Sequence, residues 1–445
     1  MDQLDLNVIE GRIDECLGTN NDEGLRYELE MLGTEEVAAV INRLHHGKKK
    51  VFRLLPVSHQ QEVLWQVNNH SRKLIVASLT VNELLDLLRG MDSDDASDVA
   101  ALVPERKRKV LLANLPKDDS RDIRNILSYG QDTAGGIMQT ELIKVPESFT
   151  VSECVGRIRR LGKEMGNAYV VFVTGSRGEL RGYVPIEQLI VADPQGRIRT
   201  LVLPVTGIPV EADQEEAAHL FKDADLPVLP VVDSGGKLVG RITADDIVDV
   251  LEQEQSEDIY RLAGVGGEES IFDPAPLSAR RRLLWLTINM ATAIMAAATV
   301  SLFQGTIQKT VILAAYMPIV AGMGGNAVTQ IITIIVRSIA LKEVETANLG
   351  RILAKETTIG IINGVALGLV IGIASYLYNR SFLLGVVVAL AMLINLLIAG
   401  ISGTLIPIIL KKFRFDPALS SCVIATTCTD VGGFFAFLGL ASMLL

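Results

Sequence analysis

The C-terminal third of the chain consists of long apolar segments separated by short charged loops, and no other feature constrains the fold as strongly. The apolar segments lie at roughly 283–303, 311–336, 357–378, 381–410 and 417–445. Each is close to or longer than the ~20 residues that an α-helix needs to cross the hydrocarbon core of a bilayer. The sequence therefore predicts a five-helix transmembrane domain over residues 281–445, embedded in a lipid bilayer.

The acidic charge of the chain lies outside this region. The 445 residues include 42 Lys and Arg against 52 Asp and Glu, whereas residues 283–445 have nine against five. Residues 1–282 therefore carry a formal charge of −14 and are long enough for two soluble domains. A wholly soluble enzyme is excluded. Nucleic acid is excluded as the main partner, because the soluble part has no basic excess to meet phosphate groups.

The basic residues of the loops predict the orientation of the membrane domain. Five crossings place its two ends on opposite sides, and ten Lys or Arg residues lie on the side of the N-terminal part. Lys309 and Arg380 alone lie on the other side. Because Lys and Arg concentrate in cytosolic loops, we expect a multi-pass protein of the inner (plasma) membrane. Its N-terminal domains would be cytosolic and its C-terminus would lie on the opposite side.

One carboxylate lies deep in the predicted membrane domain. Asp430 follows about a dozen residues of the fifth apolar segment, which places it near the bilayer midplane. A carboxylate there costs roughly 2.5–3.5 kcal/mol on insertion scales, so it normally faces water, a cation or a partner. No basic residue lies at a similar depth in another segment, which favours a cation from outside the chain. The alternative is an Asp that caps a broken helix or bonds to neighbouring hydroxyls, including Thr429.

The second apolar segment contains the run MPIVAGMGGNAVTQ. Its residues Pro318, Gly322, Gly324 and Gly325 predict a weakened or broken helix. Irregular backbone at membrane depth is tolerated where it is buried or lines a water-filled cavity, and its carbonyls, with Asn326, would be oxygen ligands. The alternative is that the glycines only allow helices to pack closely.

The available ligands narrow the identity of a bound ion. The membrane segments have no His, and oxygen donors alone suit the hard cations Mg²⁺, Ca²⁺ and Mn²⁺. One carboxylate per chain is few for removing the water of Mg²⁺, so we expect a hydrated ion. A two-fold dimer would place two copies of Asp430 around one axis.

An internal repeat occupies the centre of the chain. Gly178, Leu180 and Gly182 fall 58 positions before Gly236, Leu238 and Gly240. Each copy has the pattern strand, Gly turn, strand and amphipathic helix. The unit resembles the CBS domain, which works in tandem pairs and often binds adenine nucleotides such as ATP; the two copies would be residues 131–200 and 201–250. The resemblance implies at most one nucleotide site per pair, because only the second copy has the Ser/Thr-x-x-Asp motif, as Thr243 and Asp246.

Residues 1–130 have the pattern of a helical superhelix. Apolar residues recur every three or four positions, and Pro56, Pro104 and Pro116 stand where helices are expected to begin. Two similar stretches, LLPVSHQQEVLWQV and LVPERKRKVLLANL, lie 48 positions apart. The acids of this part and of the repeat form clusters, of which MDSDDASD is the densest. They are either a solvated face or surfaces that repel until divalent cations neutralise them.

With these modules in order, the chain resembles the MgtE family of magnesium channels and transporters almost from end to end. The most specific matches are GMGGNAVTQ, FDPALSS, ATTCTDVGG and VLPVVDSGGKLVGRITADDIVDVLEQEQSEDI. The resemblance implies a multidomain α-helical membrane protein in which a connecting (plug) helix, residues 251–280, follows the CBS pair. It also implies a homodimer with a pore between protomers. The pore residues would be Asp430, Asn326, Gly324, Gly325 and Thr429.

The resemblance further implies that the cytosolic part senses Mg²⁺, which would be both cargo and regulatory ligand. The metal-binding acids would be Asp430 and Asp416 in the membrane domain, and Asp94, Asp98, Glu215, Asp225, Asp246, Glu254, Glu257 and Asp258 in the cytosolic part. At low Mg²⁺ the acidic surfaces repel and the pore opens, whereas bound Mg²⁺ closes it. The sequence leaves open the choice among Mg²⁺, Mn²⁺, Co²⁺ and Ca²⁺.

Two other functions remain open at this point. One is a secondary transporter of another solute, coupled to Na⁺ or H⁺ through Asp430, although such folds usually carry two inverted repeats. The other is a membrane-anchored nucleotide sensor without transport. An enzyme is the weakest hypothesis, because the sequence has no phosphate-binding Gly-rich motif, GxSxG or HExxH.

Overall fold

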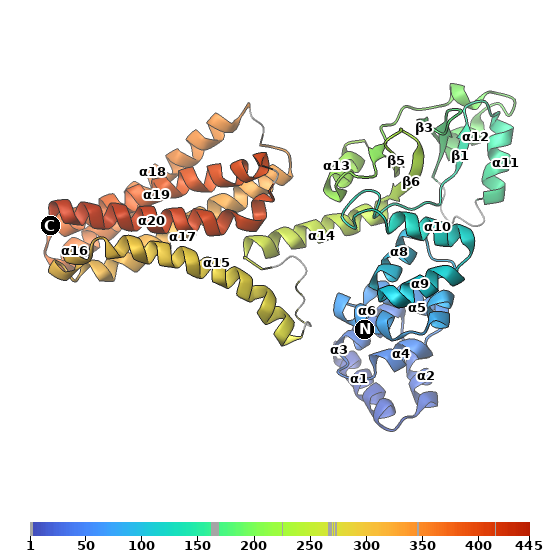
Figure 1. The fold of residues 1–445 in the computed structure, drawn as a ribbon, viewed down its shortest axis with the longest axis horizontal. Coiled ribbons are helices and arrows are strands. Elements are labelled where there is room, and N and C mark those ends of the chain that lie inside the picture. The colour runs from blue at the N-terminus through green and yellow to red at the C-terminus, as the bar shows by residue number, and fades with distance from the viewer. Residues whose placement is uncertain are drawn as a thin grey trace. The chain divides into compact units, whose positions relative to one another are not determined.

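The computed structural model describes residues 3–161, 169–224, 226–265, 269, 271, 274–344, 347–413 and 415–445. The chain divides into two compact units, Met1–Glu254 and Gln255–Leu445. Each unit has its own hydrophobic cores. Figure 1 shows the ribbon of the chain with its helices and strands labelled. The fold class expected from the sequence is confirmed: an N-terminal helical domain, a CBS pair and a C-terminal set of long apolar helices.

The first part of the N-terminal unit is helical throughout its described residues. Its helices are α1 (Gln3–Gly18), α2 (Asp22–Glu30), α3 (Thr34–Arg43), α4 (Lys48–Leu54), α5 (Val57–Gln66), α6 (Asn69–Ser78), α7 (Val81–Leu88), α8 (Ser93–Leu102), α9 (Glu105–Asn114) and α10 (Lys117–Ile126). From α3 onward each helix packs against the next but one, as α3 does on α5 and α4 on α6. Pro56, Pro104 and Pro116 are the N-cap residues of α5, α9 and α10, as expected.

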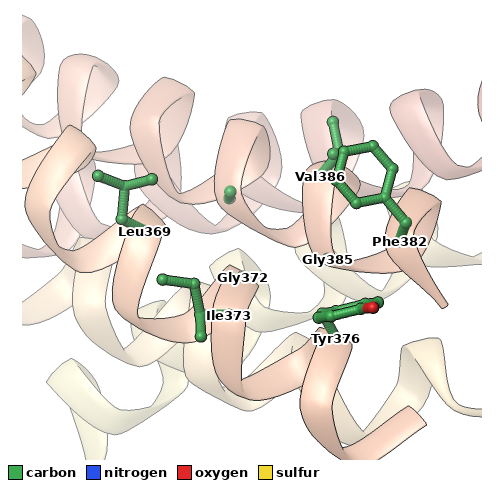
Figure 2. A pocket seen from close by; sticks show the side chains of 8 residues that line it. Leu369, Gly372, Ile373, Tyr376, Phe382, Gly385 and Val386 are labelled. Atoms are coloured by element: carbon green, nitrogen blue, oxygen red, sulfur yellow. The ribbon is translucent and has the colours of Figure 1, made fainter. Parts of the chain in front are cut away.

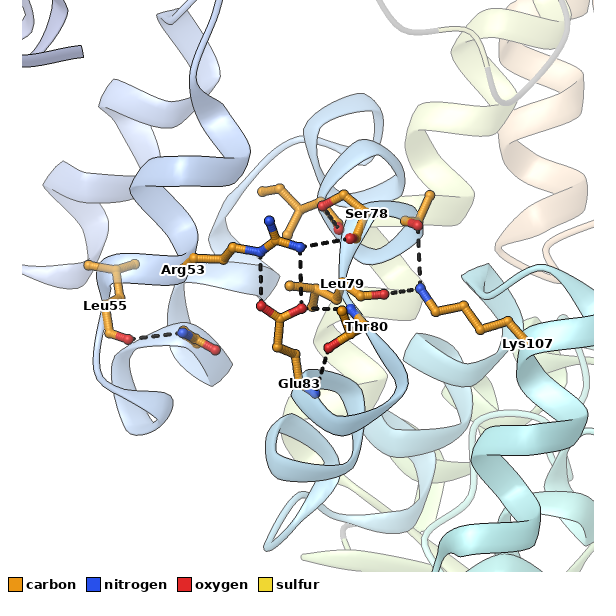
Figure 3. A network of polar contacts seen from close by, with 10 residues as sticks. Arg53, Leu55, Ser78, Leu79, Thr80, Glu83 and Lys107 are labelled. Atoms are coloured by element: carbon orange, nitrogen blue, oxygen red, sulfur yellow. Dashed lines mark hydrogen bonds and ion pairs between the residues drawn. The ribbon is translucent and has the colours of Figure 1, made fainter. Parts of the chain in front are cut away.

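Polar contacts join successive layers of this superhelix (Figure 3). Arg53 of α4 reaches Glu83 of α7, with Nε and Nη2 at 2.9 and 3.2 Å from the two carboxylate oxygens. Glu83 also accepts a hydrogen bond from the Thr80 backbone N–H at 2.6 Å, which completes the capping box of α7. Lys107 of α9 donates to the backbone carbonyl of Leu79, the residue between α6 and the N-cap Thr80 of α7.

The internal repeat folds as two three-stranded sheets of the same topology. The strands are β1 (Lys144–Pro146), β2 (Val170–Thr174) and β3 (Leu180–Pro185) in the first, and β4 (Ile208–Pro209), β5 (Val228–Val232) and β6 (Leu238–Thr243) in the second. In each sheet the first strand runs parallel to the second, and the second antiparallel to the third. The accompanying helices are α11 (Val151–Leu161), α12 (Ile186–Val191), α13 (Gln214–Ala224) and α14 (Ala244–Leu262), with a 3₁₀ turn η1 (Ile198–Thr200).

The two hairpin turns of the repeat also hold the copies together. Gly178 and Gly236 have φ values of +89° and +74°, which only glycine adopts without strain. Leu180 N donates to Gly236 O at 3.0 Å, and Leu238 N donates to Gly178 O at 3.1 Å. These two hydrogen bonds join equivalent positions, so the two copies are related by a pseudo-two-fold axis, as expected for a tandem pair.

Helix α14 is longer than the sequence indicates. The strand pattern ends before Ala244, and the helix then continues without a break to Leu262. The part from residue 251 onward, expected as a separate connecting helix, is therefore the second half of α14. Residues 266–268, 270, 272 and 273 of that expected segment lie outside the described residues.

The C-terminal unit contains five helices that are long and apolar enough to cross a membrane, counted over its described residues. They are α15 (Ala275–Ser301), α17 (Leu313–Ala340), α18 (Leu349–Asn379), α19 (Phe382–Lys412) and α20 (Pro417–Leu444), with the short α16 (Gln304–Lys309) between the first two. Helix α19 is central: it packs against α17, α18 and α20, while α15 packs against α20.

The expectation of a broken helix in the second span is wrong. Helix α17 continues through Pro318 and through the glycines that follow it. Each glycine weakens a helix by only about 1 kcal/mol, which the packing of a membrane bundle offsets. The glycines therefore free no backbone carbonyls as ligands, and only Pro318, which has no N–H, leaves a carbonyl one turn earlier without its helical donor.

Helices α18 and α19 approach closely along a row of glycines. Gly360, Gly364, Gly368 and Gly372 recur every fourth residue on α18, and a Cβ on any of them would lie 2.7 to 2.8 Å from an atom of α19. Beside the last of these contacts is an apolar hollow of about 380 Å³, lined by residues that include Leu369, Ile373, Tyr376 and Phe382 (Figure 2). Small residues thus let these two helices touch at the backbone.

Candidate functional site

Asp430 lies half-buried in the middle of α20. Because the helix continues on both sides of it, Asp430 does not cap a broken helix. The hydroxyls beside it are engaged by the helix itself: Thr427 Oγ1 donates to Val423 O at 2.7 Å, and Thr429 Oγ1 to Thr426 O at 2.9 Å. These two protons are not directed at the carboxylate, which keeps a partly exposed position.

A polar stripe runs along the exposed side of α17 next to α20. It consists of Asn326, Thr329, Gln330 and Thr333, each exposed in the protomer. The spacing of three and four residues places them on one face of the helix. Thr329 lies within hydrogen-bond reach of Cys422 on α20, so the stripe borders the helix that carries Asp430. Polar side chains are costly in lipid, so this surface needs water or protein against it.

The glycines of the two motifs have different surroundings. Gly324 is buried against the Asn395 side chain, where an added Cβ would lie 2.3 Å from Nδ2. At Gly325 the nearest atom to an added Cβ is a methyl carbon of Thr426, at 3.9 Å. The close-packing alternative therefore describes Gly324, whereas Gly325 lies at an open surface. Thr429, expected at the pore, is fully buried in the protomer.

Sequence reasoning missed Asn395, a fully buried amide on α19. Its Nδ2 donates to Val320 O of α17 at 2.8 Å, while its Oδ1 has no hydrogen-bond partner among the residues that the structure describes. On the α20 side, a Cβ on Gly433 would lie 2.7 Å from Asn395 Cγ. The signal in the sequence was a single amide within the most apolar of the membrane segments.

An arginine joins two of the expected metal-binding acids at the charged end of the C-terminal unit. Arg261, near the end of α14, donates to Glu257 on the same helix and to Asp416, the N-cap of α20. Asp416 Oδ1 also accepts from Ala418 N at 2.7 Å. Next to Arg261, Leu262 packs against the apolar cluster formed by α17, α19 and α20. The guanidinium therefore occupies the place of a cation shared by two carboxylates.

A second group of acids lies between α8 and the start of α14, within the N-terminal unit. Asp94 is buried, at 8% exposure, and its Oδ1 has no hydrogen-bond partner. Asp246 Oδ2 accepts from Thr243 N at 3.0 Å and from Thr243 Oγ1 at 2.6 Å. The two groups expected to hold a nucleotide are thus bonded to each other. Gln139 Nε2 lies 3.5 Å from the same Asp246 oxygen.

The electrostatics of this cluster disfavour ionised carboxylates. Burial, and next the Asp246 carboxylate, hold the pKa of Asp94 well above its ordinary value. Burial raises the pKa of Asp246 as well, against the hydrogen bonds from Thr243. Burial and then Asp246 raise the pKa of Asp95 to about 7. Burial and neighbouring carboxylates raise pKa values in this way, and Arg72 offsets the effect only in part, at Asp98, so a divalent cation would stabilise the cluster.

The other expected metal-binding acids are dispersed. Glu254 accepts a hydrogen bond from Gln214 Nε2 at 2.6 Å, which ties α13 to α14. Glu215 lies 3.7 Å from His219 on the same helix. Asp225 lies outside the described residues. Asp98, on α8 with Asp94, is not dispersed but belongs to the acid group above: burial raises its pKa to about 6, Arg72 lowers it and Asp246 raises it.

The arrangement does not provide a complete metal cage. Among the described residues, no three His, Cys, Asp or Glu side chains are placed to hold one metal ion. Pairs of carboxylates are what the structure brings together: Asp94 with Asp246, and Glu257 with Asp416 through Arg261. Such pairs suit an ion that keeps part of its water shell, as Mg²⁺ does.

Comparison with known proteins assigns the family. Residues 317–440 match the family model MgtE, described as a divalent cation transporter, residues 32–132 match the MgtE intracellular N domain, and residues 201–253 match the CBS domain. The chain is 31% identical over 442 residues to the magnesium transporter MgtE of Thermus thermophilus, covering 97% of this chain and 98% of that protein. It is 30% identical over 353 residues to the magnesium transporter MgtE of Bacillus subtilis, covering 79% and 78%.

Among solved structures, the cytosolic domain of the Mg²⁺ channel MgtE in complex with ATP is 31% identical, with a TM-score of 0.48, and covers 54% of this chain and 99% of that one. The soluble part of a magnesium transporter is 24% identical with a TM-score of 0.46, covering 56% and 99%. The near full-length relative, together with domain matches in the expected order, shows that the chain belongs to the MgtE family of divalent cation transporters.

Proposed function

We propose that this chain is a Mg²⁺ channel of the plasma membrane, which conducts the hydrated ion into the cell and is closed by cytosolic Mg²⁺. Its family consists of transporters rather than enzymes, and its relatives are named magnesium transporters. The observation that carries the proposal is the half-exposed Asp430 in the middle of an apolar helix, beside the polar stripe of α17.

The exposed polar surface supports a dimer with the pore between protomers. In a lone protomer, Asp430 and the stripe from Asn326 to Thr333 would meet lipid, which is costly for polar and charged groups. A second copy related by a two-fold axis would cover this surface with the same surface. Two Asp430 carboxylates would then face one axis, and rings of acids of this kind select cations.

The donor set supports passage of a hydrated ion. Each protomer contributes one carboxylate, and the other groups along the path are uncharged amides and hydroxyls. Mg²⁺ loses its water reluctantly and is commonly held through one or two carboxylates with several waters retained. Two Asp430 carboxylates would match that requirement through outer-shell hydrogen bonds.

The acid pairs support negative feedback by the transported ion. Without a cation, burial and the Asp246 carboxylate keep the pKa of Asp94 well above its ordinary value, so that Asp94 stays protonated and hydrogen-bonded to Asp246. A divalent ion that replaces this proton would hold α8 and α14 together. The second half of α14 ends on the cluster formed by α17, α19 and α20, so ordering of α14 would act on the cytosolic mouth. Mg²⁺ that binds the closed state more tightly shifts the population toward it.

The test is Mg²⁺ flux into liposomes under an inward-negative potential. We expect flux with the wild type and its loss with Asp430→Asn, which removes the charge at constant size. Cys428→Ser, a change at an exposed neighbour on α20, is the matched control and should conduct. No Mg²⁺ flux from folded wild-type protein would refute the channel, and Ca²⁺, Mn²⁺ and Co²⁺ in the same assay define selectivity.

A second arm tests the feedback. Raising Mg²⁺ on the side of the N-terminal unit should reduce the wild-type flux. The triple variant Asp94→Asn, Asp98→Asn and Asp246→Asn should need a higher Mg²⁺ concentration for the same reduction. Asp92→Asn, an exposed acid of the same run, is the matched control. An identical inhibition curve for the triple variant would show that this cluster is not the sensor.

A further inference from the structure

We propose that Asn395 is a positioning residue of the cation pathway: its amide, held between Gly324 of α17 and Gly433 of α20, sets the spacing of the two helices that carry Asn326 and Asp430. This inference deepens the proposed function and rests on it. Asn395 itself lies on α19, is fully buried, and does not touch the pathway surface.

The first step of the argument is steric. A Cβ on Gly324 would lie 2.3 Å from Asn395 Nδ2, and a Cβ on Gly433 would lie 2.8 Å from both Nδ2 and Oδ1. Real Cβ contacts do not occur at these distances, so both helices pack on the amide more closely than any residue other than glycine allows. The neighbouring glycines differ, because Gly325 is open and Gly322 has no atom within 4 Å of an added Cβ.

The second step is the position of the contact along each helix. Gly324 precedes Asn326 by two residues, and Gly433 follows Asp430 by three. At about 1.5 Å of rise per residue, each contact lies within one turn of its pathway residue. A side chain of different size at position 395 would therefore change the separation of Asn326 and Asp430.

The third step concerns the hydrogen bond. Asn395 Nδ2 donates to Val320 O of α17 at 2.8 Å, which fixes the register of α19 against α17. Among the described residues, Asn395 Oδ1 is buried without a partner, and such a group normally lowers stability. The amide therefore contributes here through the position it gives α17 and α20 rather than through a fully satisfied set of hydrogen bonds.

The steric step is tested by a double-mutant cycle in the purified full-length protein. Gly324→Ala should lower the midpoint of thermal unfolding, and Asn395→Ala in the same chain should recover a large part of that loss, because the methyl group then occupies vacated space. Gly322→Ala is the matched control on the same helix and should have little effect. Additive losses in the double variant would overturn the proposed contact.

The positioning step is tested with Asn395→Leu, which keeps the branching of the side chain, removes the hydrogen bond and adds bulk between the two glycines. We expect a lower unfolding midpoint from overpacking and, in the folded protein, a several-fold change in the Mg²⁺ to Ca²⁺ flux ratio. The control is Asn379→Leu, which removes an amide that donates to the Tyr316 hydroxyl at 2.7 Å. It should leave the flux ratio unchanged even if stability falls.

The outcomes separate the two proposals. An unchanged flux ratio in folded Asn395→Leu protein would reduce Asn395 to a packing residue while the channel proposal stands. Absence of Mg²⁺ flux in the wild type would refute the channel itself. The double-mutant cycle would still decide whether Asn395 packs against Gly324. If Asn395→Leu does not fold, Asn395→Ala is measured for the same ratio, and an unchanged value overturns the proposal.

Discussion

The acid cluster of the N-terminal unit makes a prediction about pH and stability that separates repulsion from a merely solvated surface. The perturbation is Asp95→Asn in the full-length protein without divalent cations. Burial, and then the Asp246 carboxylate, raise the pKa of Asp95 from 3.8 to about 7. The folded state therefore binds more protons than the unfolded state between these pH values, and its stability falls as pH rises through that window.

The size of the effect follows from that shift. A rise from 3.8 to about 7 corresponds to about 4 kcal/mol above pH 7. Asp95 is partly exposed, and screening by solvent reduces this to about 2 kcal/mol. Asp95→Asn should thus stabilise the metal-free unit by about 2 kcal/mol at pH 8 and by no more than about 0.5 kcal/mol at pH 4, since the folded carboxyl is protonated there and the unfolded carboxyl is only about half ionised.

The assay uses the fluorescence of Trp65, whose ring lies 4.7 Å from the guanidinium carbon of Arg72, a residue that interacts with Asp95 and Asp98. Unfolding by urea is followed at pH 4 and pH 8 in a Trp285→Phe background, which leaves Trp65 as the single tryptophan of the chain. Asp14→Asn, an exposed acid on α1 that is not among the charges that raise the pKa of Asp95, is the control, with an expected change below about 0.5 kcal/mol. A stabilisation of equal size at both pH values, or a loss of stability at pH 8, would refute the reasoning.

Two further predictions concern the C-terminal unit. Gly368→Ala should destabilise the membrane domain by about 1–3 kcal/mol, because its Cβ would lie 2.7 Å from Ala389 O. The control is Gly350→Ala on the same helix, whose Cβ would meet open space. Detergent-induced unfolding measures both variants, and equal effects would contradict the close approach of α18 and α19. Arg261→Gln should lower the Mg²⁺ concentration that half-closes the channel, because the cation shared by Glu257 and Asp416 is removed, while Arg261→Lys should retain most of the wild-type response. An unchanged inhibition curve for Arg261→Gln would mean that Mg²⁺ does not compete for these two acids.

Much of the architecture was predictable because it depends on local patterns. The length and hydropathy of the apolar segments are enough to predict the membrane helices, and their ends moved only where charged residues such as Arg351 and Lys355 continue a helix. The repeat around Gly178 and Gly236 predicts its hairpins, because a positive φ at a tight turn favours glycine. Asp430 was identified from the free-energy cost of a carboxylate near the bilayer midplane, because a group that costs so much is normally functional.

The wrong expectation of a broken helix has a physical origin. Pro318 and the glycines of α17 have low helix propensity, and propensity is overridden when a helix packs against neighbours. The role of Thr429 at the pore stays a prediction: adjacent helical residues point about 100° apart, and in the protomer Thr429 faces the interior while Asp430 is partly exposed.

By itself the sequence determined which segments span the membrane, where the repeat turns, and that one acid stands within the apolar region. Each of these follows from the chemistry of a short stretch of chain. Tertiary structure alone decided which distant groups meet: Asp94 with Asp246, Arg261 with Asp416, and Asn395 with Gly324 and Gly433. Such meetings depend on how helices pack on one another, and packing joins residues whose separation along the chain carries no signal of their contact.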